Sequence, residues 1–182
     1  MIFGVTGFNA AGKGEFCNYL ATKGFVVYSL SDIIREELKK EGREITRESM
    51  IAKGNELRQK HGSSILAKLT MQKLEPGKDY VIDSIRNPEE IGFLKRNQGF
   101  RLVFVDAPLE ARYKRVANRR REGEEKQTFK EFKELEQREA SNADSSSQQL
   151  VKCKEMADIV INNDSTLKAF HKKIDKLVEA VR

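Results

Sequence analysis

The chain has 182 residues and carries 34 lysines and arginines against 28 aspartates and glutamates, a net charge of +6. This length suits one domain with a substantial core, and the basic balance favours anionic partners such as nucleotides, with nucleic acid the weaker alternative. The two cysteines lack a metal-ligand spacing, and no apolar run is long enough to span a membrane. We therefore expect a soluble cytoplasmic protein, without membrane partners, that is a monomer or a homodimer.

A glycine-rich loop near the N-terminus is the strongest functional signal. An apolar run at 2–6 predicts a buried strand, and residues 15–20 predict a helix. Between them lies Gly7-Phe8-Asn9-Ala10-Ala11-Gly12-Lys13-Gly14, which has the spacing of a phosphate-binding loop, G-x-x-x-x-G-K. Glycines let the backbone N–H groups point at phosphate oxygens, and the helix N-terminus and the lysine add positive charge.

The predicted loop defines a set of donor contacts. We expect the donor phosphates to lie against Gly7, Asn9, Ala10, Ala11, Gly12, Lys13, Gly14 and Glu15. Gly14 stands where such loops usually carry Ser or Thr, so the hydroxyl that would contact Mg²⁺ is missing. Water, the nucleotide and a more distant carboxylate must then hold the metal, and Asp83 is the candidate. The alternative is an ordinary glycine-rich turn followed by a solvated lysine.

Short apolar strands alternate with helices along the rest of the chain. Further strands are expected at 25–28, 80–82, 101–105 and 159–161. Helices are expected to begin at Ser31, Thr46, 62–63, Asn87, Pro108, Thr128, Leu150 and Ser165, and Pro76-Gly77 is expected to end the one that begins at 62–63. This order predicts an α/β three-layer sandwich, a five-stranded parallel sheet with helices on both faces.

Polar side chains follow the second and third predicted strands. Asp32 and Arg35 come after the second strand, and Asp83 and Arg86 come after the third. Ligands gather at the carboxyl ends of parallel strands, and a planar guanidinium binds phosphate through two hydrogen bonds. We therefore expect Arg35 and Arg86 to hold an acceptor phosphate. The alternative for Arg35 is a surface ion pair with Glu36 or Asp32.

A basic stripe precedes a highly charged segment that we interpret as a helical lid at about 119–140. Arg112, Arg115 and Arg119 recur at three and four residues, so one helical face presents their guanidinium groups. Arg138 lies on the far side of the charged segment. Closure of the lid would bring these cations onto a transferring phosphate and exclude water. The same stripe could contact nucleic acid, although it lacks interleaved aromatic residues.

Together these residues resemble the P-loop nucleoside monophosphate kinases, including their adenylate kinase and dephospho-CoA kinase relatives. Asp32-Ile33-Ile34-Arg35 is similar to the acceptor-site Asp-x-x-Arg of that family, and Arg115-Val116-Ala117-Asn118-Arg119 is similar to the pair that flanks its lid. The ending at 157–164 resembles dephospho-CoA kinases, where the turn containing Asn163 lies against the nucleotide base. Segments around 57–62, 83–88 and 152–158 look like the kinase-like domain that precedes some deoxycytidylate deaminases.

The resemblance implies one P-loop kinase domain over 1–182, with an acceptor-binding helical insertion at about 31–75. It would use ATP and Mg²⁺ to phosphorylate a nucleoside or deoxynucleoside monophosphate. The implied catalytic residues are Lys13, Arg86, Arg115, Arg119 and Arg138, and the implied acceptor-binding residues are Asp32, Arg35 and Arg86. Two alternatives stay open: a dephospho-CoA kinase in which Asp32 is the base for a ribose hydroxyl, and a nucleotide-sensing module with little turnover.

Overall fold

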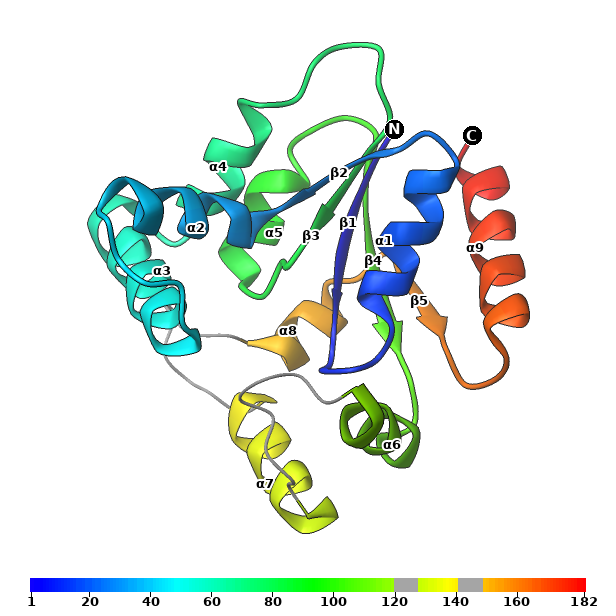
Figure 1. Ribbon diagram of the computed structural model, residues 1–182. Helices are drawn as coiled ribbons and strands as arrows, with labels where there is room; N and C mark the ends of the chain where they lie inside the picture. The colour runs from blue at the N-terminus through cyan, green and yellow to red at the C-terminus, as the bar shows by residue number, and fades with distance from the viewer. Residues whose placement is uncertain (120–127, 141–148) are drawn as a thin grey trace.

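The computed structural model contains one parallel sheet of five strands (Figure 1). The strands are β1 (Ile2–Gly7), β2 (Val26–Ser29), β3 (Tyr80–Asp83), β4 (Phe100–Asp106) and β5 (Ile159–Asn162), in the spatial order β2-β3-β1-β4-β5. The structure describes residues 1–119, 128–140 and 149–182, without the side chains of Arg47, Arg119, Leu135, Arg138, Glu139 and Ala140. The four neighbouring pairs are all parallel, so the strands end at one common edge.

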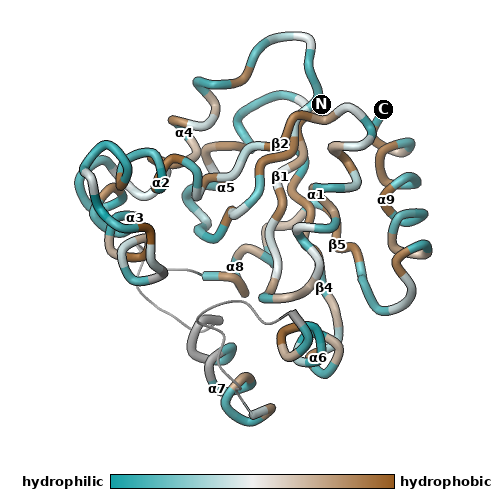
Figure 2. Tube along the Cα trace, viewed as in Figure 1, coloured by the Kyte–Doolittle hydropathy of each residue, from teal (hydrophilic) through white to brown (hydrophobic). Residues whose placement is uncertain are grey.

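Helices pack on both faces of this sheet. On one face lie α1 (Lys13–Thr22) and α9 (Leu167–Val181), which share a core with β1, β4 and β5. On the other lie α2 (Leu30–Lys40), α3 (Arg47–His61), α4 (Ile65–Met71), α5 (Pro88–Leu94) and α8 (Leu150–Glu155). The strands run mainly through hydrophobic residues, whereas α3 is largely hydrophilic (Figure 2). The predicted three-layer sandwich is confirmed.

The remaining helices lie beyond the carboxyl edge of the sheet, where the predicted site lies. They are α6 (Leu109–Arg119) and α7 (Phe129–Ala140), and both chain termini lie at the opposite edge (Figure 1). Thr128 and Glu131 form the predicted capping box, since each side chain accepts the other's backbone N–H, at 3.3 and 2.7 Å. The charged part of the expected lid at 120–127 lies outside the described residues.

Several predicted helix boundaries are shifted: α4 begins at Ile65 rather than at 62–63, and Thr166 rather than Ser165 caps α9. Two further shifts each have a local cause. Ser29, rather than Ser31, caps α2, because the helix begins directly at the end of β2 and Asp32 completes a capping box with Ser29. Helix α4 ends at Met71, before Pro76-Gly77, because the next N–H groups bond only three residues back and tighten the last turn. The predicted caps at Thr46 and Asn87 are confirmed. No helix in the described ranges is long and apolar enough to cross a bilayer.

Candidate functional site

The glycine loop joins β1 to α1 at the carboxyl edge of the sheet, and two of its glycines are sterically required. A Cβ on Gly7 would lie 2.2 Å from the carbonyl oxygen of Val105, and one on Gly12 would lie 2.2 Å from Nδ2 of Asn163. Both glycines also have positive φ angles, 145° and 113°. The loop backbone therefore lies too close to Val105 and Asn163 for a side chain at either glycine, and its φ angles favour glycine at both positions.

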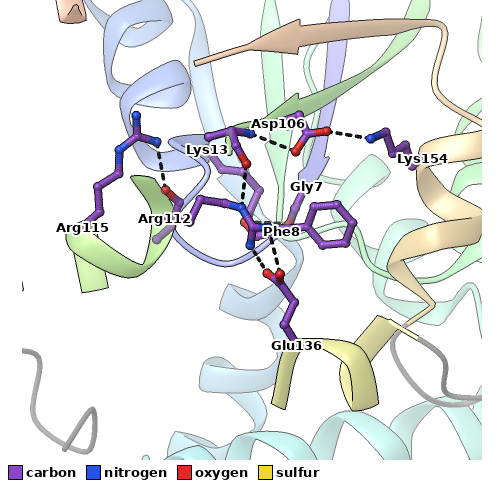
Figure 3. A network of polar contacts seen from close by, with 10 residues as sticks. Gly7, Phe8, Lys13, Asp106, Arg112, Arg115, Glu136 and Lys154 are labelled. Atoms are coloured by element: carbon purple, nitrogen blue, oxygen red, sulfur yellow. Dashed lines mark hydrogen bonds and ion pairs between the residues drawn. The ribbon is translucent and has the colours of Figure 1, made fainter. Parts of the chain in front are cut away.

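Lys13 is the first residue of α1 and lies back over the loop. Its Nζ donates to the carbonyl oxygens of Gly7 and Phe8 at 2.8 and 2.9 Å (Figure 3). The N–H of Phe16 donates to the carbonyl of Gly12 at 3.0 Å, which is the first hydrogen bond of the helical pattern. The backbone N–H groups of the first turn, before Phe16, therefore do not take part in that pattern. The amides of the first turn, a helix dipole and a lysine ammonium meet at this point, which is the combination that binds phosphate.

Asn163 and Arg115 hold the loop in place through hydrogen bonds to its backbone carbonyl groups. Nδ2 of Asn163, a residue with 8% of its surface exposed, donates to the carbonyl of Ala11 at 2.9 Å. Nη1 of Arg115 lies 3.2 Å from the carbonyls of both Ala10 and Ala11, and its Nη2 donates to the carbonyl of Asn163 at 2.8 Å. Arg115 therefore connects α6, the loop and the turn after β5.

Arg112 differs from the sequence-based expectation. Its guanidinium is buried, with Nε donating to the carbonyl of Ala107 at 2.8 Å and both terminal nitrogens paired with the carboxylate of Glu136 on α7. The group also lies 5.0 Å from the ring centroid of Phe8 in the loop (Figure 3). Arg112 contacts the same loop as Arg115, but its guanidinium is already paired with Glu136, whereas we expected it to be available to a transferring phosphate.

Asp83, at the end of β3, has one buried carboxylate oxygen without a hydrogen-bond partner in the described part of the chain. Oδ1 of Asp83 is buried without a hydrogen-bond partner, and Oδ2 lies 3.4 Å from the hydroxyl of Ser84. Ser84 has a φ of 66°, which is uncommon outside glycine, and its hydroxyl bonds to that of Ser29 at 2.9 Å. One carboxylate suits a Mg²⁺ ion that keeps most of its waters and binds chiefly to nucleotide phosphates. The residues present therefore fit the expected metal.

Two backbone hydrogen bonds fix the position of Arg86. Its N–H donates to Oε2 of Glu90 at 3.1 Å, and its carbonyl accepts the N–H of Gln149 at 2.9 Å. Glu90 is fully buried, and its other oxygen accepts from Arg58 of α3 at 3.0 Å. Burial raises the pKa of Glu90, while Arg58 and the backbone N–H groups oppose this. Sequence analysis missed Arg58 and Glu90, although the spacing from Asn87 to Glu90 is that of a capping box.

Comparisons with known proteins agree with this architecture. The family model for an AAA domain matches residues 4–144. A UPF0200 protein from Thermococcus gammatolerans is 31% identical over 188 residues, which cover 100% of this chain and 95% of that protein. The chain belongs to the UPF0200 family and carries an AAA domain.

Solved kinases share the fold of this UPF0200 chain. Shikimate kinase from Bacteroides thetaiotaomicron superposes with a TM-score of 0.59 at 14% identity, covering 98% of each chain. Dephospho-CoA kinase from Campylobacter jejuni gives 0.55 at 15% identity, covering 99% of this chain and 96% of that one. The UPF0200 chain thus has the P-loop kinase fold.

Other predicted site residues of the UPF0200 chain have protein partners or lie outside the described part. Arg35 pairs with Asp32 at 2.6 Å on the exposed side of α2, which matches the surface-pair alternative. Glu15 of α1 pairs with His171 of α9 at 2.6 Å, and sequence analysis gave no signal for that contact. Asn9 and Gly14 are exposed on the loop and at its junction with α1. The side chains of Arg119 and Arg138 lie outside the described residues, so their roles stay predictions.

Proposed function

We propose that this protein transfers the γ-phosphoryl group of ATP to the phosphate of a nucleoside or deoxynucleoside monophosphate. The strand order carries the proposal. Because β2, β3 and β1 are neighbours and parallel, Arg35, Arg86 and the phosphate-binding loop follow strand ends at the same edge of the sheet. This common edge supports a donor cradle at the loop and an anionic acceptor held by the two arginines.

The proposed roles follow from the chemistry of phosphoryl transfer. Lys13 and the loop amides hold the donor, with Gly7, Gly12 and Asn163 fixing the loop. Mg²⁺, held through water by Asp83, would neutralise charge on the donor phosphates. The acceptor phosphate is already an anion, so no general base is needed. Catalysis then depends on position and on positive charge.

Several arginines must exchange partners when substrates bind. Arg35 would leave Asp32, whose pair with it is exposed and worth little, and bind the acceptor. Arg115 would exchange loop carbonyls for the transferring phosphate, joined by Arg119 and Arg138. In this proposal residues 1–182 form one kinase domain, the insertion at 31–75 binds the acceptor, and the lid at 119–140 closes over the phosphates.

A second candidate is transfer to a hydroxyl, because the fold is shared with a dephospho-CoA kinase and a shikimate kinase. Such a reaction uses a base, and Asp32 is the candidate. Both of its oxygens have partners, since Oδ1 binds Arg35 at 2.6 Å and Oδ2 accepts the N–H of Ser29 at 3.2 Å. Asp32→Asn should nearly abolish transfer to a hydroxyl and only weaken binding of a phosphate acceptor.

The test is ADP release from ATP and Mg²⁺ across all ribo- and deoxynucleoside monophosphates, with dephospho-CoA and shikimate as hydroxyl acceptors. We expect turnover with one monophosphate or a small group of them, and its loss in Lys13→Ala. Turnover only with a hydroxyl acceptor would support the second candidate. No ADP release with any acceptor, together with intact ATP binding, would support a nucleotide-sensing module. The glycine at position 14, where such loops usually carry a hydroxyl side chain, also favours this alternative.

A further inference from the structure

A pair of titratable side chains joins α1 to α9 close to the phosphate-binding loop. Nε2 of His171 lies 2.6 Å from Oε1 of Glu15, and the two side chains are 26% and 37% exposed. The imidazole stacks on the ring of Tyr19, with centroids 3.9 Å apart and planes 10° from parallel. Two residues of α1 therefore fix the position of this ring.

The location of Glu15 gives the pair a consequence for phosphate binding. Glu15 is the third residue of a helix that begins at Lys13, and helical side chains lean toward the N-terminus of their helix. The positive end of α1 attracts anions, so the carboxylate of Glu15 and a bound phosphate compete for the same field and repel each other. Neutralising Glu15 should therefore favour phosphate.

We propose that His171 is a positioning residue for donor binding, which holds Glu15 on the α9 side and neutralises it when the imidazole is protonated. The inference rests on the proposed binding of ATP at the loop. The affinity of the loop for a polyphosphate then depends on a residue 156 positions away in the chain. Activity with an acceptor is not required to observe it.

Several charged and polar side chains lie near His171. Glu15 and Tyr19 face it from α1, and Asp175 lies four residues further along α9. Asp175 accepts the hydroxyl of Tyr19 at 2.8 Å and pairs with Lys23 at 3.1 Å, and its pKa is lowered by Tyr19, Lys23 and the charge of His171. His171 therefore has two acidic neighbours, Glu15 and Asp175, and one nearby cation, Lys23.

The experiment measures ATP affinity by calorimetry without acceptor, at pH 6 and pH 8. The proteins are the parent chain, His171→Ala, Glu15→Gln and the double variant. We expect His171→Ala to weaken binding about two- to fivefold, the effect of one charge near a helix N-terminus. Glu15→Gln should not weaken binding, and in its background the effect of His171→Ala should disappear. The parent should lose affinity toward pH 8 relative to Glu15→Gln, a comparison that cancels the titration of ATP itself.

Lys172→Ala is the matched control, because Lys172 is an exposed cation adjacent to His171 on the same helix. We expect its ATP affinity to match that of the parent. An equal effect of His171→Ala with and without Glu15 would overturn the inference, and so would weaker binding by Glu15→Gln. A folded parent chain that does not bind ATP would overturn the proposed function, whereas binding that depends on Lys13 leaves only the role of His171 at stake.

Discussion

Arg58 of α3 and Glu90 of α5 form an ion pair in which the carboxylate is completely buried. Nη2 of Arg58 lies 3.0 Å from one oxygen of Glu90, and the other oxygen accepts the N–H groups of Arg86 and Asn87 at 3.1 and 3.2 Å. One carboxylate thus connects the helices after β2 to the backbone of Arg86. Arg86, the candidate acceptor-binding residue, is therefore positioned by an ion pair between α3 and α5.

Arg58→Ala should strongly destabilise the protein. The substitution leaves Glu90 buried without its cation, and breaking a buried pair in this way typically costs about 3–5 kcal/mol. Lys60→Ala is the matched control, because it removes an exposed cation two residues away on α3 and should change stability by about 0.5 kcal/mol or less. Urea unfolding measures both. A loss below about 1 kcal/mol for Arg58→Ala would contradict the role assigned to the pair.

Gly12→Ala should destroy the phosphate-binding loop. Its Cβ would displace the amide of Asn163 and break the bond to Ala11, at a backbone angle that alanine rarely adopts. Gly14→Ala is the control two residues further on, because a Cβ there meets nothing within 4 Å. We expect ATP binding to be lost only in Gly12→Ala, as measured by calorimetry. Comparable binding by both variants would show that the loop is not the nucleotide site.

Asp158 should make stability depend on acidic pH. Burial alone would raise the pKa of Asp158, but Lys95 at 2.6 Å and the N–H of Leu102 at 2.7 Å hold it below its usual range. Its stabilising effect is therefore present above about pH 4 and is lost as the pH falls through the lowered pKa. Melting temperatures between pH 6 and pH 2.5 should fall more for the parent than for Asp158→Asn. Parallel curves for the two proteins would exclude this role for the carboxylate.

The two cysteines should be unreactive in the folded protein. Cys17 and Cys153 are buried, and burial raises the pKa of both thiols, to about 12 for Cys153. Because the thiolate is the reactive form, a thiol reagent at pH 8 should label them only after unfolding. Ser165→Cys places a thiol at an exposed position and should react at once. Prompt labelling of the folded parent chain would contradict the burial.

Local signals explain why the sheet and the loop could be predicted from sequence. Alternation of apolar strands with helices gave the sheet, G-x-x-x-x-G-K gave the loop, and Asn87-Pro88 gave the start of α5. Each of these signals lies within a few neighbouring residues. Backbone geometry and helix capping act over the same short range, so sequence reasoning reaches them.

Contacts between distant segments explain what could not be predicted. The pairing of Arg112 depends on Glu136, which lies 24 residues later on another helix, and the contact of Glu15 with His171 spans 156 residues. Helical spacing places Arg112 and Arg115 on one face but does not say which partner each will meet. The partners come from packing, and packing sets the direction of a side chain once the helix exists.

The most direct test of the proposed function is the fate of the γ-phosphate. ATP labelled at that position is incubated with Mg²⁺, the parent chain and the nucleoside monophosphates, and the labelled products are separated. We predict labelled nucleoside diphosphate from the parent chain and none from Lys13→Ala. Label found only in inorganic phosphate, in a phosphorylated hydroxyl acceptor or in unreacted ATP would contradict transfer to a nucleoside monophosphate.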